Sequence, residues 1–551
     1  MASSVTIRRS WWREWWRYVA GIVTQVVGNP VVVRELRVRV RFARAYWLQA
    51  LYLLFLILIV GLAYTSTLGS QVILDPYRAQ QQLQAFYWII FSALISLIVL
   101  IAPGLTASAV TLERERRTLD LLLATPLSAR QLLTGKLVGS FAFLVLLIAL
   151  TLPASAVCVL LGGATFDEVL ESYLMLALSG LTLSALALFT SAYSRSSMWA
   201  VFGGYLLCFA YLLATLPFTL LSFAAASGGV ATVMGRELVA PLSVLNPFSA
   251  PVLAGLSLRV GGWEIPAWVV SLVVCLLFVR LVMTGAARRV GLYDKDVLPS
   301  FRRQLLLVAA VYTYLTTVGM ATILSGAVGG PGFWSSGADV ITWFLLIVSV
   351  PMVVTVLLIT PIGKREEHPA VDDGLFNPLR MFAPSAAGAL PYITLLWLVV
   401  VGAIVLGSQP LWRFLNLSQQ SAFFAMVFYL YGIWVLLWGV ARLGSALAGH
   451  HGLGVARWMS ITLAVALSIL PPFALTLLFG VSPLQLEVSS FLHWLWFPMP
   501  VIYFFDVASR NAPFASTLDA EALLVLVRGG LGWLVVGLLF GLIARRRRDV
   551  S

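Results

Sequence analysis

Long apolar stretches recur along this chain and leave few folds open to it. Each is about 20 residues long, enough for an α-helix to cross a hydrocarbon layer of about 30 Å. We place about twelve of them, at residues 46–65, 86–110, 137–161, 172–191, 198–223, 266–284, 304–325, 341–361, 390–408, 421–442, 457–479 and 524–544. Backbone groups in lipid must hydrogen-bond within their own segment, and the stretches lack the strict alternation of barrel strands. The sequence therefore predicts an all-α, polytopic membrane protein.

Composition and charge support this class and set an orientation. Hydrophobic residues make up 60% of the chain and charged residues 11%, against about 45–50% and about 25% in soluble domains. If both termini are cytoplasmic, most of the 36 Lys and Arg residues fall on the inner side, as the positive-inside rule requires. The basic surplus then lies against anionic lipid, and no nucleic acid is needed to explain it. Because bacterial outer membranes hold β-barrels, we expect a multi-pass protein of the plasma (inner) membrane.

Three regions follow from the positions of the spans. Residues 1–45 are an Arg-rich cytoplasmic arm, whose first part has the pattern of an amphipathic helix lying at the membrane surface. Residues 46–290 hold six spans, and residues 291–551 hold six more. The apolar run 491–505 is short and interrupted by two prolines, so we interpret it as a re-entrant or interfacial segment.

Several kinds of active site are missing from the sequence. It contains no GxxxxGK[ST] phosphate loop, so no ATPase of that fold is encoded in it. Cys158, Cys208 and Cys275 fall inside spans and are interpreted as small buried residues. The four histidines lack further ligands at metal-binding spacing. We predict no catalytic residue, no metal site and no cofactor bound by this chain itself.

Two other classes of function stay open at this level. A membrane-embedded, lipid-linked transferase would need an acidic group at an outer loop. Asp167, Glu168 and Glu171 form the one tight acidic group there, and we interpret it as a solvated loop. An ATP-independent secondary transporter would need charged or unwound polar sites inside its spans, and the span centres here carry no charge.

A charged segment, ERERRTLDLLLATPLSARQLLTGKL (Glu113–Leu137), lies between the second and third spans. Glu113 and Arg117 are four residues apart and can pair along a helix. Thr125–Pro126 ends that helix, and a capping box formed by Ser128 and Gln131 starts another. The pattern predicts a helix, a sharp turn and a second helix at the membrane surface. An ordinary amphipathic loop is the alternative.

This segment resembles the one that follows the second span of ABC-2 type permeases, E-R-E-x-G-T-L-E-L-L-L-x-T-P-L-S with a later G-K-L. NPVVVRELRVRVR (Asn29–Arg41) resembles the N-terminal arm of one bacterial branch of that family. The six spans before residue 290 and the outer loop 224–265 also fit its six-helix unit. Arg117 departs from the family pattern, which usually has Gly there. The departure implies a longer helix or an altered contact with the partner.

The resemblance implies a permease that exports a substrate and is driven by a separate ABC ATPase subunit. Two copies of that subunit are expected, and they bind the ATP and Mg. Within a coupling helix at 111–136, the stretch from Glu113 to Asp120 would form the helix that sits in a cleft of the ATPase. Its contact residues would be Glu113, Arg114, Glu115, Arg116, Arg117, Thr118 and Asp120. A second contact is expected at Arg34, Glu35 and Arg37. Pro103 and Pro153 would be bend points of spans two and three, or simply tolerated kinks.

The second half repeats the order of inner and outer loops without a clear repeat of residues. It is a degenerate second permease unit, so that one chain forms a pseudo-dimeric pore, or an accessory six-helix domain on a chain that forms a homodimer. The sequence does not identify the substrate.

Overall fold

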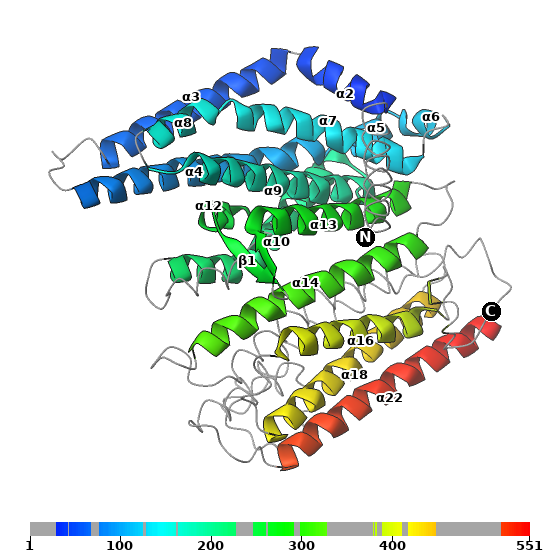
Figure 1. Ribbon diagram of the computed structural model, residues 1–551. Coiled ribbons are helices and arrows are strands. Elements are labelled where there is room, and N and C mark those ends of the chain that lie inside the picture. The colour runs from blue at the N-terminus through cyan, green and yellow to red at the C-terminus, as the bar shows by residue number, and fades with distance from the viewer. Residues whose placement is uncertain are drawn as a thin grey trace, which may run out of the picture. The chain divides into compact units, whose positions relative to one another are not determined.

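Helices make up nearly all of the part of the chain that the structure describes (Figure 1). The computed structural model describes residues 29–41, 43–67, 76–124, 128–160, 163–226, 246–260, 263–290, 298–327, 378, 381–382, 388–409, 417–447 and 520–550. The chain divides into two units, Met1–Val297 and Leu298–Ser551. Each is described by itself.

The first unit is built around one central helix. Its helices, in chain order, are α2 (Pro30–Arg41), α3 (Ala43–Thr67), α4 (Pro76–Thr106), α5 (Thr111–Glu115), α6 (Leu119–Leu123), α7 (Ala129–Ala149), α8 (Leu152–Leu160), α9 (Phe166–Tyr193), α10 (Ser197–Ala226), the 3-10 turn η1 (Pro247–Ser249), α12 (Ala250–Leu253) and α13 (Ala267–Val290). α9 packs against α4, α7, α10 and α13. Gly180 allows α7 to approach α9 closely, because a Cβ at this position would lie 2.7 Å from a methyl group of Leu144.

The third predicted span is divided in the structure. α7 begins at Ala129, earlier than the predicted start at residue 137, and ends at Ala149. α8 begins at Leu152 with Pro153 as its second residue. Pro103 lies inside α4, three residues before that helix ends.

Beside the start of α9, a short hairpin replaces part of the predicted outer loop 224–265. Strand β1 (Ser257–Val260) pairs antiparallel with β2 (Trp263–Pro266). The backbone N–H of Gly255, just before β1, donates to Glu171 Oε2 at 2.7 Å. Thr165 and Glu168 form a capping box that starts α9. The interpretation of Asp167, Glu168 and Glu171 as a loop was therefore wrong, because all three lie at the start of α9. Glu168 caps this helix and Glu171 tethers it to Gly255.

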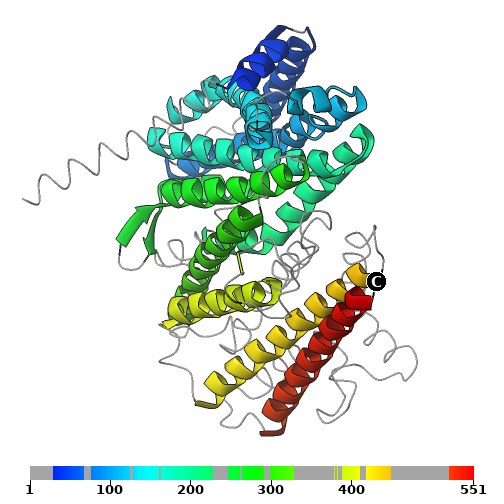
Figure 2. The same ribbon diagram turned by 90° about the vertical axis from the view of Figure 1, so that its right-hand side faces the viewer.

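The second unit contains four described helices: α14 (Leu298–Ala327), α16 (Ala389–Gly407), α18 (Leu417–Leu447) and α22 (Ala520–Val550). α18 and α22 run side by side in both views (Figures 1 and 2). Facing glycines let the two backbones touch. A Cβ at Gly432 would lie 2.3 Å from the carbonyl oxygen of Gly530, and one at Gly439 would lie 2.1 Å from that of Gly537. The seven-residue spacing on each helix keeps this seam on one face.

Eight helices within the described residues are long and apolar enough to cross a membrane. They are 46–65, 82–115, 129–149, 166–193, 267–290, 389–407, 423–444 and 527–546. The chain is thus a multi-pass membrane protein, as predicted. α10 and α14 cover the predicted spans 198–223 and 304–325 as 30-residue helices but are not among the eight. The predicted spans 341–361 and 457–479, the N-terminal surface helix, the run 491–505 and the four histidines lie outside the described residues.

The three cysteines are buried and form no disulfide bond, which confirms their interpretation as small buried residues. Among the described residues, no group of three or more His, Cys, Asp or Glu side chains is placed to hold a metal ion.

Candidate functional site

The charged segment between α4 and α7 folds as two single-turn helices, which we call the elbow (residues 107–124). α5 ends at Glu115, and α6 starts at Leu119. The predicted continuous helix from Glu113 to Asp120 was therefore wrong. α6 ends at Leu123, and Thr125–Pro126 lies outside the described residues. The predicted capping box at the start of α7 is confirmed, because Ser128 and Gln131 each accept a backbone N–H of the other.

The turn between α5 and α6 depends on Arg117, whose φ of 56° is left-handed. The Thr118 N–H donates to the Glu113 carbonyl at 2.9 Å, and the Arg117 N–H donates to the Arg114 carbonyl at 3.1 Å. This is the Schellman pattern that ends a helix, and its left-handed position is usually glycine. Arg117 therefore takes the conformation that favours glycine and stops the helix. The expectation of a longer helix was wrong.

The inner side of the elbow packs into the core of the first unit. Val110 and Leu119 are buried in a cluster with residues of α2, α7, α9 and α13. Leu122 packs against the same cluster. The buried Ser191 of α9 accepts the N–H groups of Val110 at 3.0 Å and Thr111 at 3.3 Å. α9 thus supplies the N-terminal cap that α5 lacks in its own sequence.

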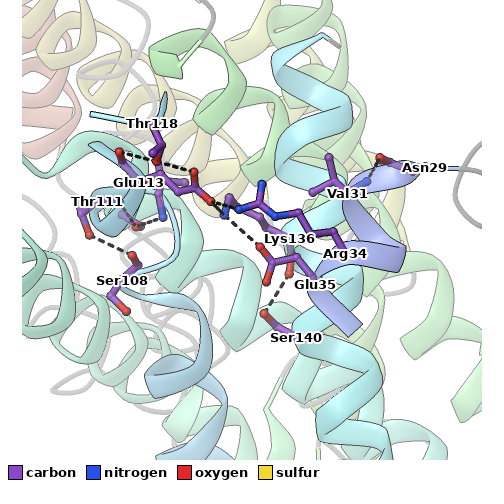
Figure 3. Close-up of polar contacts among 12 residues, drawn as sticks. Asn29, Val31, Arg34, Glu35, Ser108, Thr111, Glu113, Thr118, Lys136 and Ser140 are labelled. Carbon is purple, nitrogen blue, oxygen red and sulfur yellow. Dashed lines mark hydrogen bonds and ion pairs between the residues drawn. The ribbon is translucent and has the colours of Figure 1, made fainter. Parts of the chain in front are cut away.

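Glu113 points inward to Lys136 of α7 (Figure 3). Lys136 Nζ lies 2.9 Å from Glu113 Oε1, and the Thr118 hydroxyl donates to Glu113 Oε2 at 3.0 Å. Arg34 of α2 lies 3.8 Å from the same carboxylate. Glu113 therefore faces α7 and α2. The predicted pair with Arg117 was wrong, because the helix ends before it reaches that residue.

Lys136 also joins the elbow to α2. Its ammonium lies 3.2 Å from Glu35 Oε1 as well as 2.9 Å from Glu113 Oε1. The Lys136 side chain is only 4% exposed, Glu113 12% and Glu35 19%. Sequence reasoning missed the role of Lys136, although it is one of three lysines in an Arg-rich chain and is the central residue of the quoted GKL motif.

Two glycines of α7 bring α2 close enough for this contact. A Cβ at Gly135 would lie 2.6 Å from Val31 Cβ, and one at Gly139 would lie 2.7 Å from Glu35 Cβ. Asn29 starts α2 by accepting the Val31 N–H at 3.0 Å, and its amide group donates to the Gln131 carbonyl at 2.7 Å. α2 is thus held against α7 by close packing at Gly135 and Gly139 and by the ion pair between Lys136 and Glu35.

The next two charged residues of the elbow bind other helix ends. Arg114 donates to the carbonyls of Ser194 and Ala192 at the end of α9. Glu115 accepts the backbone N–H of Ser197 at 2.6 Å and its hydroxyl at 2.8 Å, at the start of α10. A cation at a helix C-terminus and an anion at an N-terminus both complement the helix dipole. The elbow is therefore bound to four helices: α2, α7, α9 and α10.

The remaining predicted residues face outward. Arg116, Arg117 and Asp120 are exposed, and Leu121 beside them is 70% exposed. We call these four residues the docking face. On α2, Arg34 and Arg37 are exposed, whereas Glu35 turns inward. The predicted site residues thus fall into a set that binds neighbouring helices and fixes the elbow, to which the exposed Glu115 also belongs, and a set that is exposed to solvent.

The described span 82–115 and the elbow lie within a region that matches a known family. Residues 65–284 match the family model described as ABC-2 family transporter protein. No curated protein matches the chain. The match contains the elbow, α7, α9 and α10, and it excludes α2. Residues 65–284 are therefore an ABC-2 family transporter membrane domain, carried by a multi-pass membrane protein.

Proposed function

We propose that this chain is the transmembrane permease subunit of an ABC transporter and is driven by a separate ATPase subunit. The ABC-2 domain at residues 65–284 supports this reading, and the sequence contains no phosphate loop of its own. The ATP and Mg would then be bound by two copies of the partner. Transport is expected to be export across the plasma (inner) membrane, with both termini cytoplasmic and about twelve spans.

The observation that carries the proposal is the two-sided elbow. Its inner side is bound to α2, α7, α9 and α10 through Glu113, Arg114 and Glu115. The docking face carries two arginines, one aspartate and an exposed leucine, a combination suited to a cleft with an apolar floor and charged walls. A displacement of the docking face by the ATPase would therefore be transmitted to α7, α9 and α10 together. Arg37, on the exposed side of α2, is the best candidate for a second contact.

The test is binding of an ABC ATPase from the same organism, sought first in a neighbouring reading frame. We expect it to co-purify with the wild-type chain and to bind Leu121→Asp at least tenfold more weakly, because a buried hot-spot residue carries about 2 kcal/mol or more. Leu160→Asp is the matched control: Leu160 is 85% exposed and belongs to α8, beyond the far end of α7. No co-purification, or unchanged binding by Leu121→Asp, would refute the proposal.

The same purified complex also answers how many copies of this chain form the pore. A fused pore predicts one copy of this chain beside two ATPase subunits, and an accessory second half predicts two copies of each. Mass measurement of the complex distinguishes them.

The transferase alternative is weakened because Glu168 and Glu171 are engaged in capping and tethering α9.

A further inference from the structure

Lys136 lies between α5, which is inside the region matched by the family model, and α2, which is outside it. It belongs to α7, and its ammonium contacts Glu35 on α2 and Glu113 on α5. Glu35 and Lys136 are 101 residues apart in sequence, and Lys136 and Glu113 are 23 apart. One buried cation therefore holds two carboxylates from separate segments (Figure 3).

The surroundings make this bridge stronger than a surface ion pair. Lys136 is nearly completely buried, so water and salt screen its charge little. Gly135 and Gly139 flank it and seat α2 directly against α7. The other charged link between α2 and the elbow, Arg34 to Glu113, is longer at 3.8 Å, and the Arg34 side chain is 58% exposed. Exposed ion pairs of that kind contribute little to the free energy of folding. Lys136 is thus the main polar connection between α2 and the elbow among the described residues.

We propose that Lys136 is a positioning residue that makes α2 and the elbow move as one body. This inference rests on the proposed function. α2 runs toward α3, the first span, with only residue 42 between their described ends. A displacement of the docking face is therefore passed through Glu113 and Lys136 to Glu35, and from α2 to the first span. Without the bridge, the elbow would move α4 and α7 and leave the first span behind.

The bridge is tested first on the full chain alone, without an ATPase. Spin labels at Arg37→Cys on α2 and Arg116→Cys on the elbow occupy exposed positions, with the three buried cysteines replaced by alanine. The distance distribution between the labels is measured in wild-type, Lys136→Met, Lys136→Arg and Glu35→Gln backgrounds. We expect its width to at least double in Lys136→Met and in Glu35→Gln, and to stay near wild-type in Lys136→Arg, which keeps a cation that can reach both carboxylates.

Two controls separate the bridge from general loosening. Asp120→Asn removes an exposed elbow charge and should leave the distribution unchanged. A second label pair, Arg116→Cys with Arg130→Cys at the start of α7, should broaden in Lys136→Met but not in Glu35→Gln, because Glu35→Gln keeps the bond between Glu113 and Lys136. Glu35→Gln also keeps the experiment decisive if Lys136→Met does not fold. An unchanged Arg37–Arg116 distribution in Glu35→Gln would overturn the inference.

The second measurement uses the complex with the ATPase. Lys136→Met should keep its affinity for the ATPase within about threefold, because the docking face is intact, while transport per ATP hydrolysed falls at least tenfold. Lys136→Arg should restore most of this ratio. A residue that only stabilises the fold would lower binding and transport together, and that result would overturn the inference. If no ATPase binds the wild-type chain, the proposed function fails, and the label distances still decide whether the bridge exists.

Discussion

The close seat of α2 on α7 predicts a measurable penalty for Gly135→Ala. The added Cβ would lie 2.6 Å from Val31 Cβ and 2.7 Å from Val31 Cγ1. Because carbon atoms pack at about 3.5–4.0 Å, α2 has to move by about 1 Å. Overpacking of this kind costs about 1–3 kcal/mol, and the better helix propensity of alanine offsets about 0.5–1 kcal/mol.

At the midpoints of these two ranges the net penalty is about 1.2 kcal/mol, and it falls on the docking of α2. At 1.4 kcal/mol per factor of ten, α2 should open roughly sevenfold more often. Amide hydrogen exchange of Pro30–Arg41, followed by mass spectrometry on the purified chain, reports this opening directly. Gly61→Ala in α3 is the matched control, because a Cβ there meets nothing within 4 Å. Equal exchange of α2 in the two variants would refute the packing argument.

Three further substitutions test other parts of the structure. Arg117→Gly should raise the unfolding temperature, because a left-handed backbone costs an L-residue about 1–2 kcal/mol that glycine avoids; a lower temperature would contradict the assigned turn. Ser191→Ala leaves two buried N–H groups at the start of α5 without their acceptor, at about 1–3 kcal/mol, and should speed hydrogen exchange in the elbow while that of α8 stays unchanged. Gly432→Ala places a Cβ 2.3 Å from the Gly530 carbonyl oxygen and should lower thermal stability far more than Gly402→Ala, which meets nothing within 4 Å.

Features that depend on neighbours in the sequence were predictable. The apolar stretches correspond to helices in each part of the chain that the structure describes. In lipid, backbone N–H and C=O groups find hydrogen-bond partners only within their own helix. The capping box of Ser128 and Gln131 was also predictable, since both partners lie within four residues. Pairing along the helix, by contrast, misled us about Glu113. A residue four positions away is a partner only if the helix continues, and here it ends at Glu115.

The sequence by itself determined the membrane class, the charged segment between two spans and the start of α7, because each depends on composition or on spacing within a few residues. Only the tertiary structure decided which partners the charges of that segment bind. Glu113 meets Lys136, Arg114 meets the end of α9, and Glu115 meets the start of α10. The physical reason is that each partner lies on another helix, 23 to 82 residues away in sequence, so that only helix packing brings it near. For Glu113, whose side chain is 12% exposed, a charge without a partner would also be costly.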